Sequence, residues 1–96
     1  DLKEAESRLT GLAQKPVRER MAESLLMLLE FYGTDKEGSI NASISREDIA
    51  NIVGTATETT IRILSDFKSE KLIDLVGKKI KIINHQGLIK TAHIYD

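Results

Sequence analysis

The chain has 96 residues, of which 41% are hydrophobic and 30% are charged, and it contains six glycines and one proline. This composition is typical of one globular domain with a modest core, and it excludes a disordered chain and two domains of ordinary size. Because there is no cysteine, a disulfide framework, a thiolate zinc site and a cysteine nucleophile are excluded within the chain. No apolar run is long enough to span a bilayer, so we expect a soluble chain without a membrane partner.

The formal net charge is −1, but the charge is unevenly distributed along the sequence. Residues 71–96 contain five basic and two acidic side chains, which gives this segment a net charge of +3. Two phenylalanines, two tyrosines and no tryptophan offer little surface on which nucleic-acid bases could stack. A basic segment on a near-neutral body is still compatible with DNA binding, with modest electrostatic affinity for a single copy.

Near the N-terminus, four apolar residues are spaced as in the seam of a coiled coil: Leu2, Ala5, Leu9 and Leu12. Two heptads are too few to be stable alone, and the alternative is a helix stub that packs on its own domain. Pro16 ends this helix because it disfavours helical geometry at Lys15, so Lys15–Pro16 is a candidate hinge. The chain starts without methionine, and we expect it to be cut from a longer polypeptide inside this helix.

Apolar residues at helical spacing predict a second helix from Val17 to about Phe31. A polar loop bounded by Gly33 and Gly38 follows it. Residues 40–44 alternate between apolar and polar side chains, which predicts a short strand with one buried face.

Two predicted capping boxes come next, over residues 45–48 and 55–58, in which a hydroxyl and a carboxylate cap opposite ends of a helix's first turn. The short helix between them is expected to bury an apolar face formed by Ile49, Ile52 and Val53. Gly54 ends that helix by supplying the left-handed conformation that a helix end prefers. Two capped helices separated by one glycine are the sequence form of a helix-turn-helix.

The predicted recognition helix, about residues 56–69, has two distinct faces on a helical wheel. The buried stripe is expected to contain Ala56, Thr60, Ile63, Leu64 and Phe67. The opposite, exposed side contains Glu58, Arg62, Ser65 and Ser69. Ile61 lies at the border of the exposed face.

The remaining residues predict a hairpin with a cationic tip and a terminal helix. Branched residues in 72–76 and 80–83 predict two strands, joined by Gly77, Lys78 and Lys79. The terminal helix, within residues 85–96, would place four apolar residues at helical spacing: Leu88, Ile89, Ala92 and Ile94. The predicted fold class is therefore α+β, a winged helix-turn-helix with a three-helix core and a β-hairpin wing.

The exposed residues of the recognition helix have chemistry complementary to a base pair. Arg62 can donate to guanine O6 and N7, and Glu58, four residues earlier, can accept from cytosine N4. Thr57 and Thr59 add hydroxyls beside this pair, and Ile61 could contact a thymine methyl group. The alternative is structural, because Glu58 also fits its capping box and an ordinary surface ion pair with Arg62.

Much of the sequence resembles the C-terminal DNA-binding domain of Crp/Fnr transcription regulators. The segments that carry the resemblance are residues 45–54, 55–64 and 70–73, with a weaker likeness at 8–13 and 17–22. It implies that residues 1–14 are the end of a dimerisation helix and that residues 15–96 form the winged helix DNA-binding domain. In this family the glutamate and arginine that match Glu58 and Arg62 contact a G·C pair in each half of a palindromic site.

The resemblance also implies where the DNA backbone is contacted. Arg46 matches a phosphate-contacting position, and Gly77 with Lys78 match the wing tip; Lys79 and Thr59 complete the expected phosphate contacts. Two residues depart from common family patterns at base-contacting positions. Thr57 replaces the arginine of the catabolite-regulator type, and Ile61 replaces a glycine or serine, so the outer bases of the half-site are left open.

For partners, the resemblance implies double-stranded DNA, a homodimer of the full-length protein and a cytoplasmic location. Family members carry an N-terminal sensor that binds a cyclic nucleotide or another effector, and no cofactor is expected in this chain itself. The loop 32–39 lies where some activators contact RNA polymerase. No catalytic or metal-ligating set is recognisable, because His85 and His93 lack partners in ligand register, so we do not expect an enzyme.

Two other function classes stay open at this point. A winged helix can serve as a protein association module, which the near-neutral net charge favours slightly. A different winged-helix regulator family with a small-molecule pocket in the domain is the weaker alternative. DNA binding through phosphates would weaken steeply with salt, and a protein association module would show no such dependence.

Overall fold

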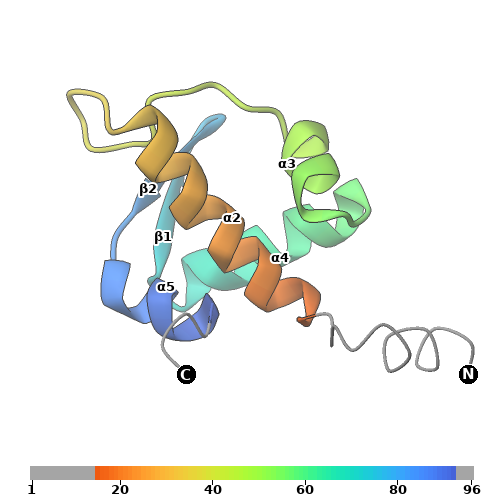
Figure 1. Cartoon of the computed structure of the whole chain (residues 1–96). Coiled ribbons are helices and arrows are strands. Elements are labelled where there is room, and N and C mark those ends of the chain that lie inside the picture. The colour runs from red at the N-terminus through yellow and green to blue at the C-terminus, as the bar shows by residue number, and fades with distance from the viewer. Residues whose placement is uncertain (1–14, 93–96) are drawn as a thin grey trace, which may run out of the picture.

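The computed structural model describes residues 15–92 as a helical body with a two-stranded hairpin on one side (Figure 1). In chain order, the elements are α2 (Val17–Tyr32), α3 (Arg46–Val53), α4 (Thr57–Ser69), β1 (Ile73–Val76), β2 (Lys79–Ile82) and α5 (His85–Ala92). The expected dimer seam (Leu2, Ala5, Leu9 and Leu12) lies outside the described residues, as do Ile94 and His93. This arrangement of helices and hairpin confirms the predicted α+β winged helix-turn-helix.

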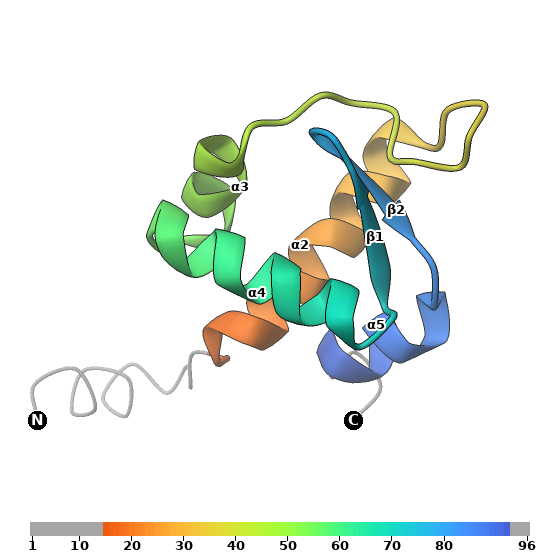
Figure 2. The same ribbon diagram turned by 180° about the vertical axis from the view of Figure 1, so that it is seen from behind.

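The core lies around α2, which packs against α3, α4 and α5. Figure 1 shows α2 running diagonally through the middle of the molecule, and the reverse view in Figure 2 shows α4 crossing it. The largest fully buried side chains are Phe67, Met21, Leu25, Ile49, Leu64, Ile73, Leu88 and Thr60. These residues come from every helix and from β1, so one contiguous core holds the helix-turn-helix and the hairpin together.

The two ends of α3 form as predicted, but the start of α4 does not. The Ser45 hydroxyl accepts a 3.0 Å hydrogen bond from the Asp48 amide, and Gly54 has φ 84° and ψ 45°, the left-handed conformation. The predicted second capping box, Thr55–Glu58, is wrong. The amide of Thr55 still donates to the carbonyl of Ala50, so the chain is turning there, and α4 begins one residue later with Ala56 as its N-cap.

The two faces of α4 agree with the helical wheel except at Ala56, the N-cap. Thr60, Ile63, Leu64 and Phe67 are buried. Ala56 is exposed, contrary to the prediction, because it precedes the helix and does not follow its periodicity.

The apolar face of α3 differs from the prediction at one position. Ala50 is buried beside Ile49 and Val53, whereas Ile52 is 45% exposed. The three buried residues span an arc of about 100° on the helix, and Ile52 lies about 60° outside that arc.

The predicted strand over residues 40–44 does not form. Two isolated bridges form instead, Thr34 with Ile40 and Ser39 with Lys81, and the Ile40 amide donates to the carbonyl of Ile80. The amide of Ala42 then donates back to the carbonyl of Ile40, so the chain turns away from β2 beyond Ile40. The predicted burial alternation is correct, with Ile40 buried and Ala42 half-buried, but alternation requires only one covered face.

The hairpin is antiparallel, and its register pairs Val76 with Lys79. The turn therefore consists of Gly77 and Lys78 alone, with Gly77 at φ 63°. The prediction that Lys79 belongs to the connecting turn is wrong, because this residue is the first of β2. Within the described residues, α5 covers His85–Ala92, and the Asn84 side chain caps its start by accepting from the Gly87 amide.

The C-terminal ends of α3 and α4 offer a matched test of backbone strain. Gly54 occupies the left-handed position after α3, whereas Lys71 occupies it after α4 with φ 62°. No atom would touch a Cβ added at Gly54, so G54A should lower the free energy of unfolding by about 1–2 kcal/mol through backbone strain alone. K71G should instead raise it by up to about 1 kcal/mol. Urea unfolding followed by circular dichroism measures both, and equal losses in the two variants would contradict this account.

Candidate nucleic-acid interface

The first two turns of α4 present four of the predicted base-contacting residues on one side of the helix. Glu58 and Arg62 are exposed, Ile61 is 52% exposed and Thr57 is half-buried. Because Glu58 and Arg62 are four residues apart, their side chains project from the same face, about one turn from each other. The structure therefore brings together the two groups that were expected to recognise a G·C pair.

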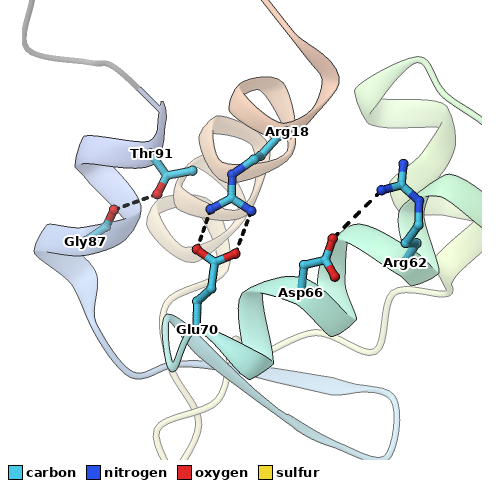
Figure 3. A network of polar contacts seen from close by, with 6 residues as sticks. All are labelled: Arg18, Arg62, Asp66, Glu70, Gly87 and Thr91. Atoms are coloured by element: carbon cyan, nitrogen blue, oxygen red, sulfur yellow. Dashed lines mark hydrogen bonds and ion pairs between the residues drawn. The ribbon is translucent and has the colours of Figure 1, made fainter.

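Neither structural alternative for Glu58 is present in the structure. It does not cap α4, because the N-cap is Ala56 and no side-chain hydrogen bond is made there. Arg62 points toward the other end of the helix, with Nη1 3.9 Å from Oδ2 of Asp66 (Figure 3). Within residues 15–92, Glu58 makes no ion pair or side-chain hydrogen bond, so its carboxylate is free to accept one from outside.

The wing turn lies next to the first residue of α3. The guanidinium of Arg46 donates from Nη1 to the carbonyl of Lys78 at 3.2 Å and from Nη2 to the carbonyl of Gly77 at 3.4 Å. Burial lowers the pKa of Arg46 from its ordinary value, but an arginine so far above neutrality stays charged. The Lys78 side chain is exposed at the tip. Three predicted phosphate contacts, Arg46, Gly77 and Lys78, are thus gathered in one place.

Lys79, by contrast, is engaged with the loop that follows α2. Its Nζ lies 2.6 Å from Oδ2 of Asp35, whose other oxygen accepts from the amides of Glu37 and Ser39. The hydrogen bond from Lys79 lowers the pKa of Asp35, and the same bond raises the pKa of Lys79. Sequence analysis did not find this pair, although an aspartate that caps nearby amides is typical of a turn.

The Asp35 ion pair predicts an acid-dependent loss of stability. A carboxyl whose pKa is lowered on folding contributes stability above its unfolded pKa, near 3.8, and loses it as the pH falls through the lower folded value. D35N should therefore have a lower Tm than the wild type at pH 7, and this difference should shrink below about pH 4.

The matched control is E37Q, which removes the same charge from the same loop but leaves the hydrogen bond between Lys79 and Asp35 intact. Thermal unfolding is measured for the three chains from pH 7 to pH 2.5 at constant ionic strength. A Tm difference between wild type and D35N that persists undiminished to pH 2.5 would show that the effect is not the ionised carboxylate.

A second contact that the sequence did not reveal holds α4 against the start of α2. Arg18 donates to both carboxylate oxygens of Glu70, at 2.9 and 2.6 Å (Figure 3). Its guanidinium carbon lies 4.9 Å from the centre of the Phe67 ring. These bonds lower the pKa of Glu70. Because Glu70 directly follows α4, the contact fixes the C-terminal end of the helix whose first turns carry Glu58 and Arg62.

The candidate hinge at Lys15–Pro16 is also tied to the body. Lys15 Nζ lies 2.9 Å from Oε2 of Glu23 and 3.1 Å from the carbonyl of Ala92 at the end of α5.

Thr59, the remaining predicted phosphate contact, is half-buried in the first turn of α4.

Other kinds of site find no support in the part of the chain that is described. Within residues 15–92, no three histidine, aspartate or glutamate side chains cluster closely enough to hold a metal ion, and none of the helices could cross a membrane. An apolar hollow between the wing and α3 has a volume of only about 10 Å³, the space of about one water molecule. That hollow is far too small for a small-molecule effector.

The geometry agrees with the comparison to known families. The Crp-like helix-turn-helix domain matches this sequence over residues 19–91, from the third residue of α2 to the second-last residue of α5. The chain belongs to the family of Crp-like helix-turn-helix domains. Membership of this family favours a DNA-binding regulator over the two other winged-helix interpretations.

Similar proteins carry their Crp-like domain as part of a longer chain. A "CRP-like cAMP-activated global transcriptional regulator" of Mycobacterium tuberculosis is 31% identical over 95% of this chain and 42% of its own length. The "Fumarate and nitrate reduction regulatory protein" of Vibrio cholerae is 29% identical over 86% of this chain and 34% of its own length. The chain thus spans less than half of the length of both relatives.

Solved structures show the same architecture. A transcriptional regulator of the CRP/FNR family from Thermus thermophilus superposes with a TM-score of 0.76 at 28% identity, covering 99% of this chain and 50% of that one. FixK2 from Bradyrhizobium japonicum gives a TM-score of 0.76 at 27% identity, covering 99% and 48%. The Crp-like fold, including its hairpin, is therefore shared with structures of transcription regulators.

Proposed function

We propose that this Crp-like domain binds double-stranded DNA and regulates transcription, with α4 lying in the major groove. The observation that carries the proposal is the unpaired carboxylate of Glu58 beside the exposed guanidinium of Arg62 on the second helix of a helix-turn-helix. Arg62 would donate to guanine O6 and N7, and Glu58 would accept from cytosine N4 of the same or the adjacent pair. Thr57 and Ile61 would contact the neighbouring bases.

The wing and the start of α3 supply the proposed contacts to the DNA backbone. Arg46, Lys78 and the amide of Gly77 lie together at the wing turn, and Thr59 lies in the first turn of α4. Lys79 can join them only in exchange for its 2.6 Å ion pair with Asp35. Phosphate contacts of this kind position the protein without reading sequence.

We further propose that two copies act together on a palindromic site. In this proposal residues 1–14 are the end of a dimerisation helix and residues 15–96 are the DNA-binding domain. Two recognition helices would then enter successive major grooves, about 34 Å apart. Effector sensing, as the name of the Mycobacterium tuberculosis relative describes for that protein, would belong to a part of the polypeptide outside this chain, and binding to the chromosome implies a cytoplasmic location.

The test is selection of binding sites from a randomised duplex library, with the chain fused at its N-terminus to a dimerising coiled coil. A recovered palindrome with one G·C pair in each half that R62A no longer selects would support sequence-specific recognition. No enrichment at low salt would overturn the proposal and favour the protein association module. The same fusion of R18K, which leaves the exposed face of α4 intact, should recover the wild-type palindrome.

A further inference from the structure

Within residues 15–92, the Arg46 side chain hydrogen-bonds the turn of the wing to the helix-turn-helix. Arg46 is the first residue of α3, and its guanidinium donates to the carbonyls of two consecutive residues, Gly77 and Lys78, more than 30 positions later in the chain. In Figure 2 the hairpin turn points toward the segment that leads into α3. The contact therefore joins the part of the domain that would position phosphates to the part that would recognise bases.

The hairpin needs such an attachment. It consists of two four-residue strands, and an isolated hairpin of this size is at best marginally stable in water. Lys79 and Lys81 hold β2 to the loop after α2, through Asp35 and Ser39 respectively, but neither contact touches the turn itself. Arg46 is the side chain that ties the turn to α3.

Arg46 also has donors left over. A guanidinium carries five N–H groups in a rigid fork, and the two carbonyls of the turn occupy only two of them. The remaining donors can face a phosphate while the guanidinium keeps its hydrogen bonds to the carbonyls of Gly77 and Lys78. A lysine at this position would keep the charge but could not reproduce the planar two-carbonyl contact.

We propose that Arg46 is a positioning residue for the wing, and that Lys78 contributes to DNA binding only when Arg46 holds the turn. The inference rests on the proposed DNA-binding function, and it goes beyond the role of Arg46 as one more cation on the backbone. If Arg46 acted through its charge alone, its contribution and that of Lys78 would be independent and additive.

A double-mutant cycle on DNA affinity tests this dependence. K78A is measured in the wild-type background and in R46K, with the duplex recovered by the selection and over a range of salt concentrations. In the wild-type background, K78A should weaken binding to all duplexes alike and reduce the slope of log affinity against log salt by about one unit. In R46K, K78A should change neither affinity nor slope appreciably, a coupling of at least about threefold.

R18K is the matched control, because Arg18 also makes a bidentate contact, with Glu70. That contact lies at the opposite end of α2 from the wing. K78A should keep its full effect in the R18K background. The proposal is overturned if K78A has the same effect in R46K as in the wild type. It is also overturned if R46K restores everything that R46A loses, since charge alone would then suffice.

A second measurement needs no DNA and separates this inference from the proposed function. Amide hydrogen exchange at residues 77–79 of the free chain should be several-fold faster in R46K than in the wild type and unchanged in R18K. Unchanged exchange in R46K would overturn the positioning role. If exchange is faster in R46K but the wild type binds no duplex, the positioning role of Arg46 is supported and only the DNA-binding function is refuted.

Discussion

F67A is expected to lower the free energy of unfolding by about 3–5 kcal/mol, the largest stability loss predicted for this domain. Phe67 is fully buried on α4, and its ring also lies beneath the guanidinium of Arg18. Truncation removes the transfer energy of the ring, leaves a cavity and takes away the surface on which Arg18 rests. Since small domains have only about 5–15 kcal/mol of stability, such a loss would unfold much of the population near physiological temperature.

F67L is the matched control, because it keeps an apolar side chain in the core but still removes the aromatic face under Arg18. It should cost less than half as much as F67A. Urea unfolding at 25 °C, followed by helical circular dichroism, measures both variants against the wild type. A loss below about 1 kcal/mol in F67A would mean that the core collapses around the site, which the close packing around Phe67 argues against.

R62A is expected to weaken binding to the selected duplex by about 1–3 kcal/mol, or roughly fivefold to 150-fold, and to relax the preference at one base pair. The guanidinium is exposed, and within residues 15–92 it pairs with the half-exposed Asp66 at 3.9 Å, a contact that contributes little stability. Folding stability should therefore stay within about 0.5 kcal/mol of the wild type. Titration of the matched and the base-substituted duplex separates lost affinity from lost specificity.

D66N gives the opposing control on the same face of α4. It removes the carboxylate toward which Arg62 leans and so should leave affinity unchanged or raise it, because that carboxylate competes with DNA for the guanidinium. A loss in D66N as large as that in R62A would show that the ion pair, and not a base contact, is the source of the effect.

How much of the fold could be predicted is clear from α4. Its buried stripe from Thr60 to Phe67 follows a helical period, and the period is a property of the sequence itself. The predicted start of the helix is one residue too early, because the hydrogen bond from Thr55 back to Ala50 depends on how the preceding turn closes. Similarly, residues 40–44 show correct burial alternation without a strand, because the hydrogen bond from Ala42 back to Ile40 turns the chain away from β2.

The candidate site divides in the same way. Glu58 and Arg62 could be placed together from their spacing on one helix. The contacts of Arg18 with Glu70, of Asp35 with Lys79 and of Arg46 with Lys78 span 52, 44 and 32 residues. Such contacts have no local period, and each pairs common surface residues, so no pattern in the sequence identifies them before the chain is folded.

The contact between Arg18 and Glu70 connects the C-terminal end of α4 to the beginning of α2. Arg18 lies two residues after Pro16, and Glu70 lies at the end of α4 remote from Thr57 and Glu58. A torque applied to the chain ahead of Pro16 would reach that end of α4 through Arg18, which contacts both Glu70 and the Phe67 ring. Helix α4 has 13 residues at about 1.5 Å each and is therefore roughly 20 Å long. A rotation of a few degrees about its C-terminal end would displace Glu58, near its N-terminal end, by about 1–2 Å.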